Sequence, residues 1–73
     1  MDTIDLKDTL ERYREQLLKL MGRCELARDR LQNELADRAR QGESFEAVRP
    51  LHDEITDVTQ DYWNAYGRVL LID

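Results

Sequence analysis

Residues 38–50, RARQGESFEAVRP, interrupt a chain whose apolar residues otherwise follow a helical repeat. Gly42 is the residue type that commonly ends a helix, and Arg38 and Arg40 would lie in its last turn, where positive charge suits the helix dipole. Ser44 is a typical N-cap for a helix that follows. The stretch therefore predicts one helix over about residues 3–41, a turn at 42–44 and a second helix over about 45–72.

The residues before the turn carry apolar side chains at alternating intervals of four and three, which is the a/d pattern of a coiled coil. Asp2, Thr3 and Asp5 are candidate N-caps for this helix. The stripe consists of Leu6, Leu10, Tyr13, Leu17, Leu20, Cys24, Ala27 and Leu31, followed by Leu35 and Ala39. One face of a long helix is thus expected to pack against another helix.

The residues after the turn repeat the same pattern. Pro50 lacks a backbone N–H and disfavours helical geometry at the residue before it, so two alternatives are open. Either one kinked helix begins near residue 45, which the unbroken phase favours, or a short turn precedes a helix that begins at Pro50. The stripe consists of Val48, Leu51, Ile55, Val58, Tyr62, Ala65, Val69 and Ile72.

Two long helices joined by so short a turn predict an all-α fold, an antiparallel two-helix hairpin in which the numbers of facing residues add up to about 86. Leu6 and Leu10 would then extend beyond the end of the second helix. Because a domain of this size rarely stabilises itself alone, we expect a homodimer that forms a four-helix bundle. Its contacts would include Leu6, Leu10, Leu18 and Met21, and the alternative is a three-helix monomer broken at Gly22.

Charge is distributed unevenly along the 73 residues. Residues 42–73 contain two Arg and seven acidic residues and so carry the whole net charge of −5. A nucleic-acid-binding protein needs a basic face, so direct nucleic-acid binding is not expected, whereas a basic protein surface suits an acidic chain. Basic residues that flank the first stripe, among them Arg14, Arg23 and Arg30, predict ion pairs with Glu54 and Asp61 across the hairpin.

Targeting and redox features point to the cytoplasm. The chain has one cysteine, Cys24, no long apolar run and no basic segment before an apolar stretch at its start, so neither membrane insertion nor export is expected.

No catalytic motif is present in the sequence. Cys24 lies within the apolar stripe and is interpreted as a core residue. The potential metal ligands are His52, Asp53, Glu54, Asp57 and Asp61, but zinc would need a second His or a Cys nearby. We therefore expect a solvated acidic face, no metal, no cofactor and no enzymatic activity.

Residues 16–27, QLLKLMGRCELA, resemble the first helix of the small all-α chorismate mutases, in which a leucine-rich segment precedes an arginine. The resemblance implies that Arg23 would contact a substrate carboxylate. It covers twelve residues, requires a one-residue gap within the helix, and finds no counterpart of the later lysine- and glutamate-bearing segments of that family.

Three of the five aromatic residues lie close together near the C-terminus. Tyr62 falls on the stripe, but Trp63, Tyr66 and Leu70 form a second ridge on another face of the helix. Exposed Trp and Tyr are typical of interface hot spots, so the ridge would pack in the dimer or bind another protein. We expect a small regulator, an inhibitor or adaptor, whose ridge anchors a partner while Asp53, Glu54, Asp57 and Asp61 meet its basic residues. That partner would be a transcription regulator or another nucleic-acid-binding protein whose basic DNA-binding surface is covered. The alternative is a purely structural homo-oligomerisation module.

Overall fold

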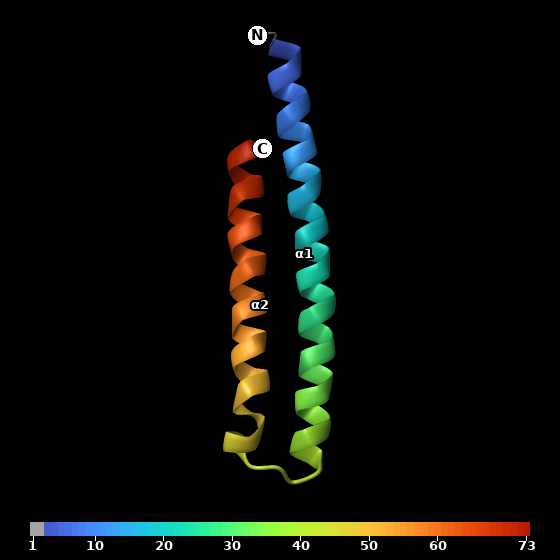
Figure 1. Ribbon diagram of the computed structural model, residues 1–73, viewed down its shortest axis with the longest axis vertical. Helices are drawn as coiled ribbons and strands as arrows, with labels where there is room; N and C mark the ends of the chain where they lie inside the picture. Colours follow the sequence, from blue (N-terminus) through green and yellow to red (C-terminus); the bar gives the residue numbers. More distant parts are fainter. Residues whose placement is uncertain (1–2) are drawn as a thin grey trace.

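The computed structural model describes residues 3–73, with side chains from Leu6 onward. It consists of helix α1 (Thr3–Arg40) and helix α2 (Phe45–Ile72), which lie side by side and antiparallel (Figure 1). The described part of the chain is 93% helical and contains no strand, so the predicted all-α hairpin is confirmed. The N-cap candidates Asp2, Thr3 and Asp5 lie outside the residues whose side chains are described.

The turn between the helices combines two capping motifs. Gly42 has a φ of +84°, and its N–H donates to the carbonyl of Ala39 while the N–H of Glu43 donates to that of Arg38. This is the Schellman arrangement, in which the left-handed residue is usually glycine. Ser44 then caps α2, since its hydroxyl accepts a hydrogen bond from the N–H of Ala47 at 3.3 Å. The chain reverses direction within residues 41–44 because both helix ends are satisfied locally.

Pro50 lies inside α2, so the structure has the continuous helix rather than the helix that begins at the proline. The ring removes one backbone donor at this position. Val48 and Leu51, on either side of it, are 5% and 9% exposed against α1. Their burial offsets the lost hydrogen bond and keeps the first turns of α2 in place.

The face of α2 that packs on α1 is the predicted stripe, since all eight of its positions are buried or half-buried. The stripe predicted on α1 is only partly right. Leu17 and Cys24 are buried, but Tyr13 and Leu20 are 40% and 42% exposed. Met21, which was predicted to lie outside the hairpin contact, packs against the cluster of Leu17, Ala65 and Val69.

The face of α1 that contacts α2 is therefore rotated around the helix axis from the predicted stripe. It includes Arg14, Met21 and Arg28, which are half-buried. Arginine can cover apolar surface with its aliphatic stem while its guanidinium stays in water. For this reason a pattern built on apolar letters alone missed the two arginines. The rotation also leaves Tyr13 and Leu20 only partly covered by α2.

The hairpin is a rod of 60 × 15 × 15 Å whose core is a single seam. The N-terminal end of α1 extends beyond the C-terminal end of α2, as predicted for Leu6 and Leu10 (Figure 1). These two side chains are 56% and 42% exposed.

Candidate protein-interaction surfaces

The hairpin has two long sides that differ in chemistry. On one side the guanidinium of Arg68 donates to the hydroxyl of Tyr13 at 3.5 Å. The same side has a shallow groove of about 210 Å³, lined by Leu17, Leu20, Asp61, Asn64, Ala65 and Arg68. We call it the Arg68 side. Residues two apart in a helix point in directions about 200° apart. Leu18, two residues before Leu20, and Tyr66, two residues before Arg68, therefore flank the seam on the opposite side, which we call the Tyr66 side.

The aromatic ridge predicted from the sequence lies on the Tyr66 side and is open to solvent. Trp63, Tyr66 and Leu70 are 59%, 38% and 57% exposed. The ring of Trp63 stands edge-on to Tyr66 at a centroid distance of 5.6 Å and to Tyr62 at 5.4 Å. Because Tyr62 is half-buried in the seam, these edge-to-face contacts connect the exposed rings to the core and limit their motion.

The four acidic residues predicted to accompany the ridge lie elsewhere. Asp61 lines the groove on the Arg68 side, and Glu54, seven residues earlier, has the same helical position. Asp57 lies on the outer face of α2, about 120° around the helix from Trp63, and Asp53 lies about 80° from Trp63 and ten residues before it. A flat partner seated on the ridge would therefore not reach Glu54 and Asp61 from the same side. Helical phase thus separates Glu54 and Asp61 from the ridge, and a combined binding surface on α2 stays a prediction.

Acidic residues of α1 border the ridge instead, and the sequence reasoning missed them. Intervals of four and three residues along α1 place these acids in one stripe on the Tyr66 side, and Leu18 and Gly22 occupy the two positions in the middle of the stripe. All four are exposed and none forms an ion pair or hydrogen bond in the described part of the chain. They are Glu11, Glu15, Glu25 and Asp29. Their spacing is visible in the sequence, but which side of α2 they accompany depends on the rotated seam.

The residues predicted as dimer contacts divide in the same way. Leu6 and Leu10 lie exposed on the extension of α1, and Leu18 is 41% exposed on the Tyr66 side. Met21 packs at the seam and is a contact within the hairpin, where it is half-buried, and its contact with a second chain stays a prediction. The excess of apolar surface that motivated a dimer is nevertheless present in Leu20, Leu26 and Leu71, which are 42%, 69% and 87% exposed.

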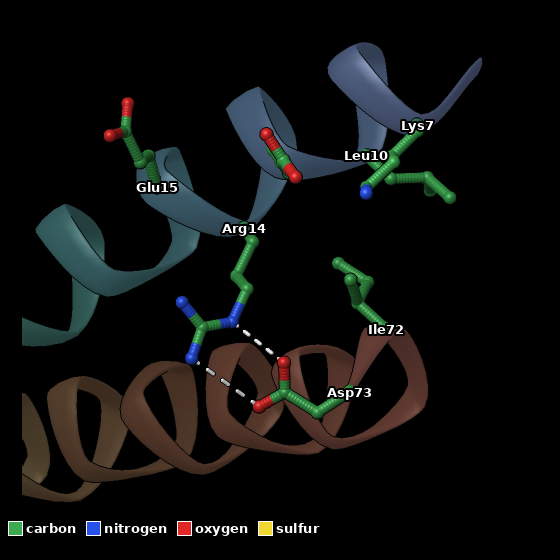
Figure 2. A pocket seen from close by; sticks show the side chains of 7 residues that line it. Lys7, Leu10, Arg14, Glu15, Ile72 and Asp73 are labelled. Atoms are coloured by element: carbon green, nitrogen blue, oxygen red, sulfur yellow. Dashed lines mark hydrogen bonds and ion pairs between the residues drawn. The ribbon is translucent and has the colours of Figure 1, made fainter. Parts of the chain in front are cut away.

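An open notch of about 540 Å³ marks the end of α2 against α1 (Figure 2). Leu10 and Ile72 face each other across it, while Glu15 points away from α2. Nε of Arg14 lies 2.7 Å from Oδ1 of Asp73, and the hydrogen bond and charge of this carboxylate raise the pKa of Arg14. This pair joins the helices in place of the expected pairs with Glu54 and Asp61. Of the two cations that line the notch, Lys7 and Arg14, the second is thus already paired with a carboxylate.

The remaining candidates for chemistry lie apart from one another. Cys24 is buried as a free thiol. His52 lies against the ring of Phe45, with a centroid distance of 6.0 Å, and its Nδ1 is 4.0 Å from Asp53. Within residues 3–73, no group of three or more His, Cys, Asp or Glu is placed to hold a metal ion. Arg23 is exposed and lines neither the notch nor the groove on the Arg68 side.

Neither helix in the described range has a stretch long and apolar enough to cross a membrane. Compared with known proteins, the chain matches no family model, no curated protein and no solved structure.

Proposed function

We propose that this protein is a non-enzymatic regulator that binds another protein through its Tyr66 side. The observation that carries the proposal is the solvent-exposed ridge of Trp63, Tyr66 and Leu70 beside acidic residues of α1 that form no ion pair in the described part of the chain. Exposed aromatic and large apolar side chains in one patch mark interaction sites in soluble proteins. A partner segment with apolar side chains for the ridge and Lys or Arg for the acids fits this surface.

The acids would act first on the rate of encounter. The net charge of −5 attracts a basic partner over about 10 Å at ~0.1 M salt and over about 30 Å at ~0.01 M, while Glu11 and Glu25 meet its charges after docking. DNA-binding proteins carry basic surfaces of this kind. Covering such a surface would make this protein an inhibitor of its partner's DNA binding.

Capture from a lysate of the native host tests the proposal with paired variants. The wild-type chain should retain a specific protein, and Trp63→Ala with Tyr66→Ala should lose it. Leu26→Ala is the matched control, because Leu26 is 69% exposed on α1 but lies outside the ridge. Glu11→Gln with Glu25→Gln should weaken retention mainly at low salt.

Retention that is equal for the wild type and the ridge variant would refute this function. A captured protein should next be tested for DNA binding with and without the hairpin. Loss of its DNA complex on adding wild type, but not on adding the ridge variant, supports the inhibitor role. An unchanged DNA complex excludes occlusion and leaves an adaptor that binds without blocking.

A further inference from the structure

Four charged residues on the Arg68 side have no partner within the hairpin. Arg23 and Arg30 of α1 share one helical position, and Glu54 and Asp61 of α2 share another. None of the four forms an ion pair or hydrogen bond in the described part of the chain, although both signs occur on the same side. In the middle of this side α1 is therefore basic and α2 acidic, while Glu34 of α1 lies nearer the turn and Arg68 of α2 lies nearer the termini.

The same side also exposes large apolar groups. Tyr13 and Leu20 of α1 are 40% and 42% exposed because the seam is rotated away from them. Leu71 of α2 is 87% exposed and lies one heptad after Asn64, which lines the groove on this side. Apolar residues thus occupy the end near both termini, and unpaired charges occupy the middle.

We propose that the Arg68 side binds the Arg68 side of a second copy, related by a two-fold axis that runs along the hairpin. This operation places α1 against the partner's α2, antiparallel, with nearly the same relation of residue numbers as inside the hairpin. Arg23 then faces the partner's Asp61 and Arg30 faces the partner's Glu54, both at a sum of 84.

The apolar end has the same register. Tyr13 faces the partner's Leu71, again at a sum of 84. Within the hairpin, Leu17 and Val69 of one core cluster add to 86, and the ion pair of Arg14 and Asp73 adds to 87. The charged and the apolar contacts therefore require the same alignment of the two copies. The two-fold symmetry forms each contact twice.

Other two-fold arrangements of this side are electrostatically unfavourable. An axis perpendicular to the rod would place α1 against the partner's α1 or α2 against the partner's α2. The first brings Arg23 and Arg30 toward arginines, and the second brings Glu54 and Asp61 toward carboxylates. A rod side of 60 by 15 Å is large enough for the ~800 Å² per partner that stable interfaces bury.

This dimer does not depend on the proposed function, because it leaves the Tyr66 side of both copies free. Sedimentation equilibrium on the purified full chain tests it with two charge-reversed variants. One carries Arg23→Glu and Arg30→Glu, and the other carries Glu54→Arg and Asp61→Arg. The matched control is Glu11→Arg with Glu25→Arg, which reverses two charges on the Tyr66 side.

We expect a dimer for the wild type and for the control. Each charge-reversed variant alone should lose about a hundredfold in dimer affinity, since four pairs of about threefold each are lost in the symmetric dimer. An equimolar mixture of the two variants should dimerise again, because the acidic α1 of one variant then meets the basic α2 of the other, and the basic α1 of the second variant meets the acidic α2 of the first. Far-ultraviolet circular dichroism checks that each variant remains helical.

Three results would overturn the interface. The wild type could sediment as a monomer at tens of micromolar, both charge-reversed variants could dimerise as well as the wild type, or their mixture could remain monomeric. Dimerisation that is lost in Trp63→Ala instead would place the self-contact on the Tyr66 side, which also contradicts the inference. Loss of target capture in Trp63→Ala with an intact dimer would show the two sides to be independent.

Discussion

Replacing Leu17 by Ala tests whether the seam described above holds the hairpin together. Leu17 is 5% exposed and lies in one cluster with Ala65 and Val69, packed further by Met21 and Ile72. A buried Leu→Ala change typically costs 2–5 kcal/mol, because apolar contacts are lost and a cavity remains. In a rod only two helices thick the cavity opens easily to solvent, so we expect a loss near the lower end, about 2–3 kcal/mol.

A loss of that size is large for this chain. At about 0.05–0.15 kcal/mol per residue, a domain of this length has a free energy of unfolding of roughly 4–11 kcal/mol. With a slope of about 1 kcal/mol per M urea, the unfolding midpoint should fall by about 2 M, measured by far-ultraviolet circular dichroism.

The control for this experiment is Leu26→Ala, which makes the same chemical change in the same helix. Leu26 is 69% exposed, so its replacement should alter the free energy of unfolding by no more than about 0.5 kcal/mol. Helix propensity changes equally in the two variants and cancels in the comparison. Equal midpoints for the Leu17 and Leu26 variants would show that the seam does not stabilise the molecule as described.

Three further substitutions test local features by the same urea titration. Gly42→Ala should destabilise the hairpin by about 1 kcal/mol, since the φ of +84° strains a residue with a Cβ; an unchanged midpoint would argue against the Schellman turn. Ser44→Ala should cost about 1 kcal/mol through loss of the cap on Ala47, and Ser44→Asp should restore most of it. Gly67→Ala should stabilise the chain by about 1 kcal/mol, because a Cβ there meets nothing within 4 Å; a loss instead would mean that a second chain packs closely on that position.

The turn and the contact face of α2 were predictable because each rests on residues with strong local preferences. Gly42 and Ser44 have the backbone and side-chain chemistry that helix ends require. The apolar stripe of α2 keeps its heptad spacing over the whole helix, so it indicates one contact face. The face of α1 was less predictable. Its apolar residues extend past both edges of the seam, and the half-buried stems of Arg14 and Arg28 read as polar in the sequence.

The acidic residues that lie beside the aromatic ridge were difficult to predict for a related reason. The sequence pattern places Trp63 and Tyr66 on a face other than the seam of α2. Closeness along the chain, however, does not place residues on one surface of a helix. Asp57 and Asp61 are close to the ridge along the chain and lie around the helix from it. The acids that do lie beside the ridge belong to α1, and identifying them requires the pairing of the two helices as well as the phase of each.

The separation of charge around α1 is what allows one short hairpin to have two binding sides. Between residues 11 and 30 its exposed acids, such as Glu11 and Glu25, lie on the Tyr66 side, and Arg23 and Arg30 lie toward the Arg68 side. If the second copy occupies the Arg68 side, the arginines and the acids of α2 are neutralised in pairs, while the acids of α1 stay exposed beside the ridge. The dimer would then present two acidic, aromatic surfaces facing away from each other, so a partner that is itself a symmetric dimer could not engage both surfaces of one assembly at once. Titration of this protein with such a partner should therefore give one binding site per chain. A stoichiometry of one site per two chains would mean that the ridges of the two copies lie together in the self-contact.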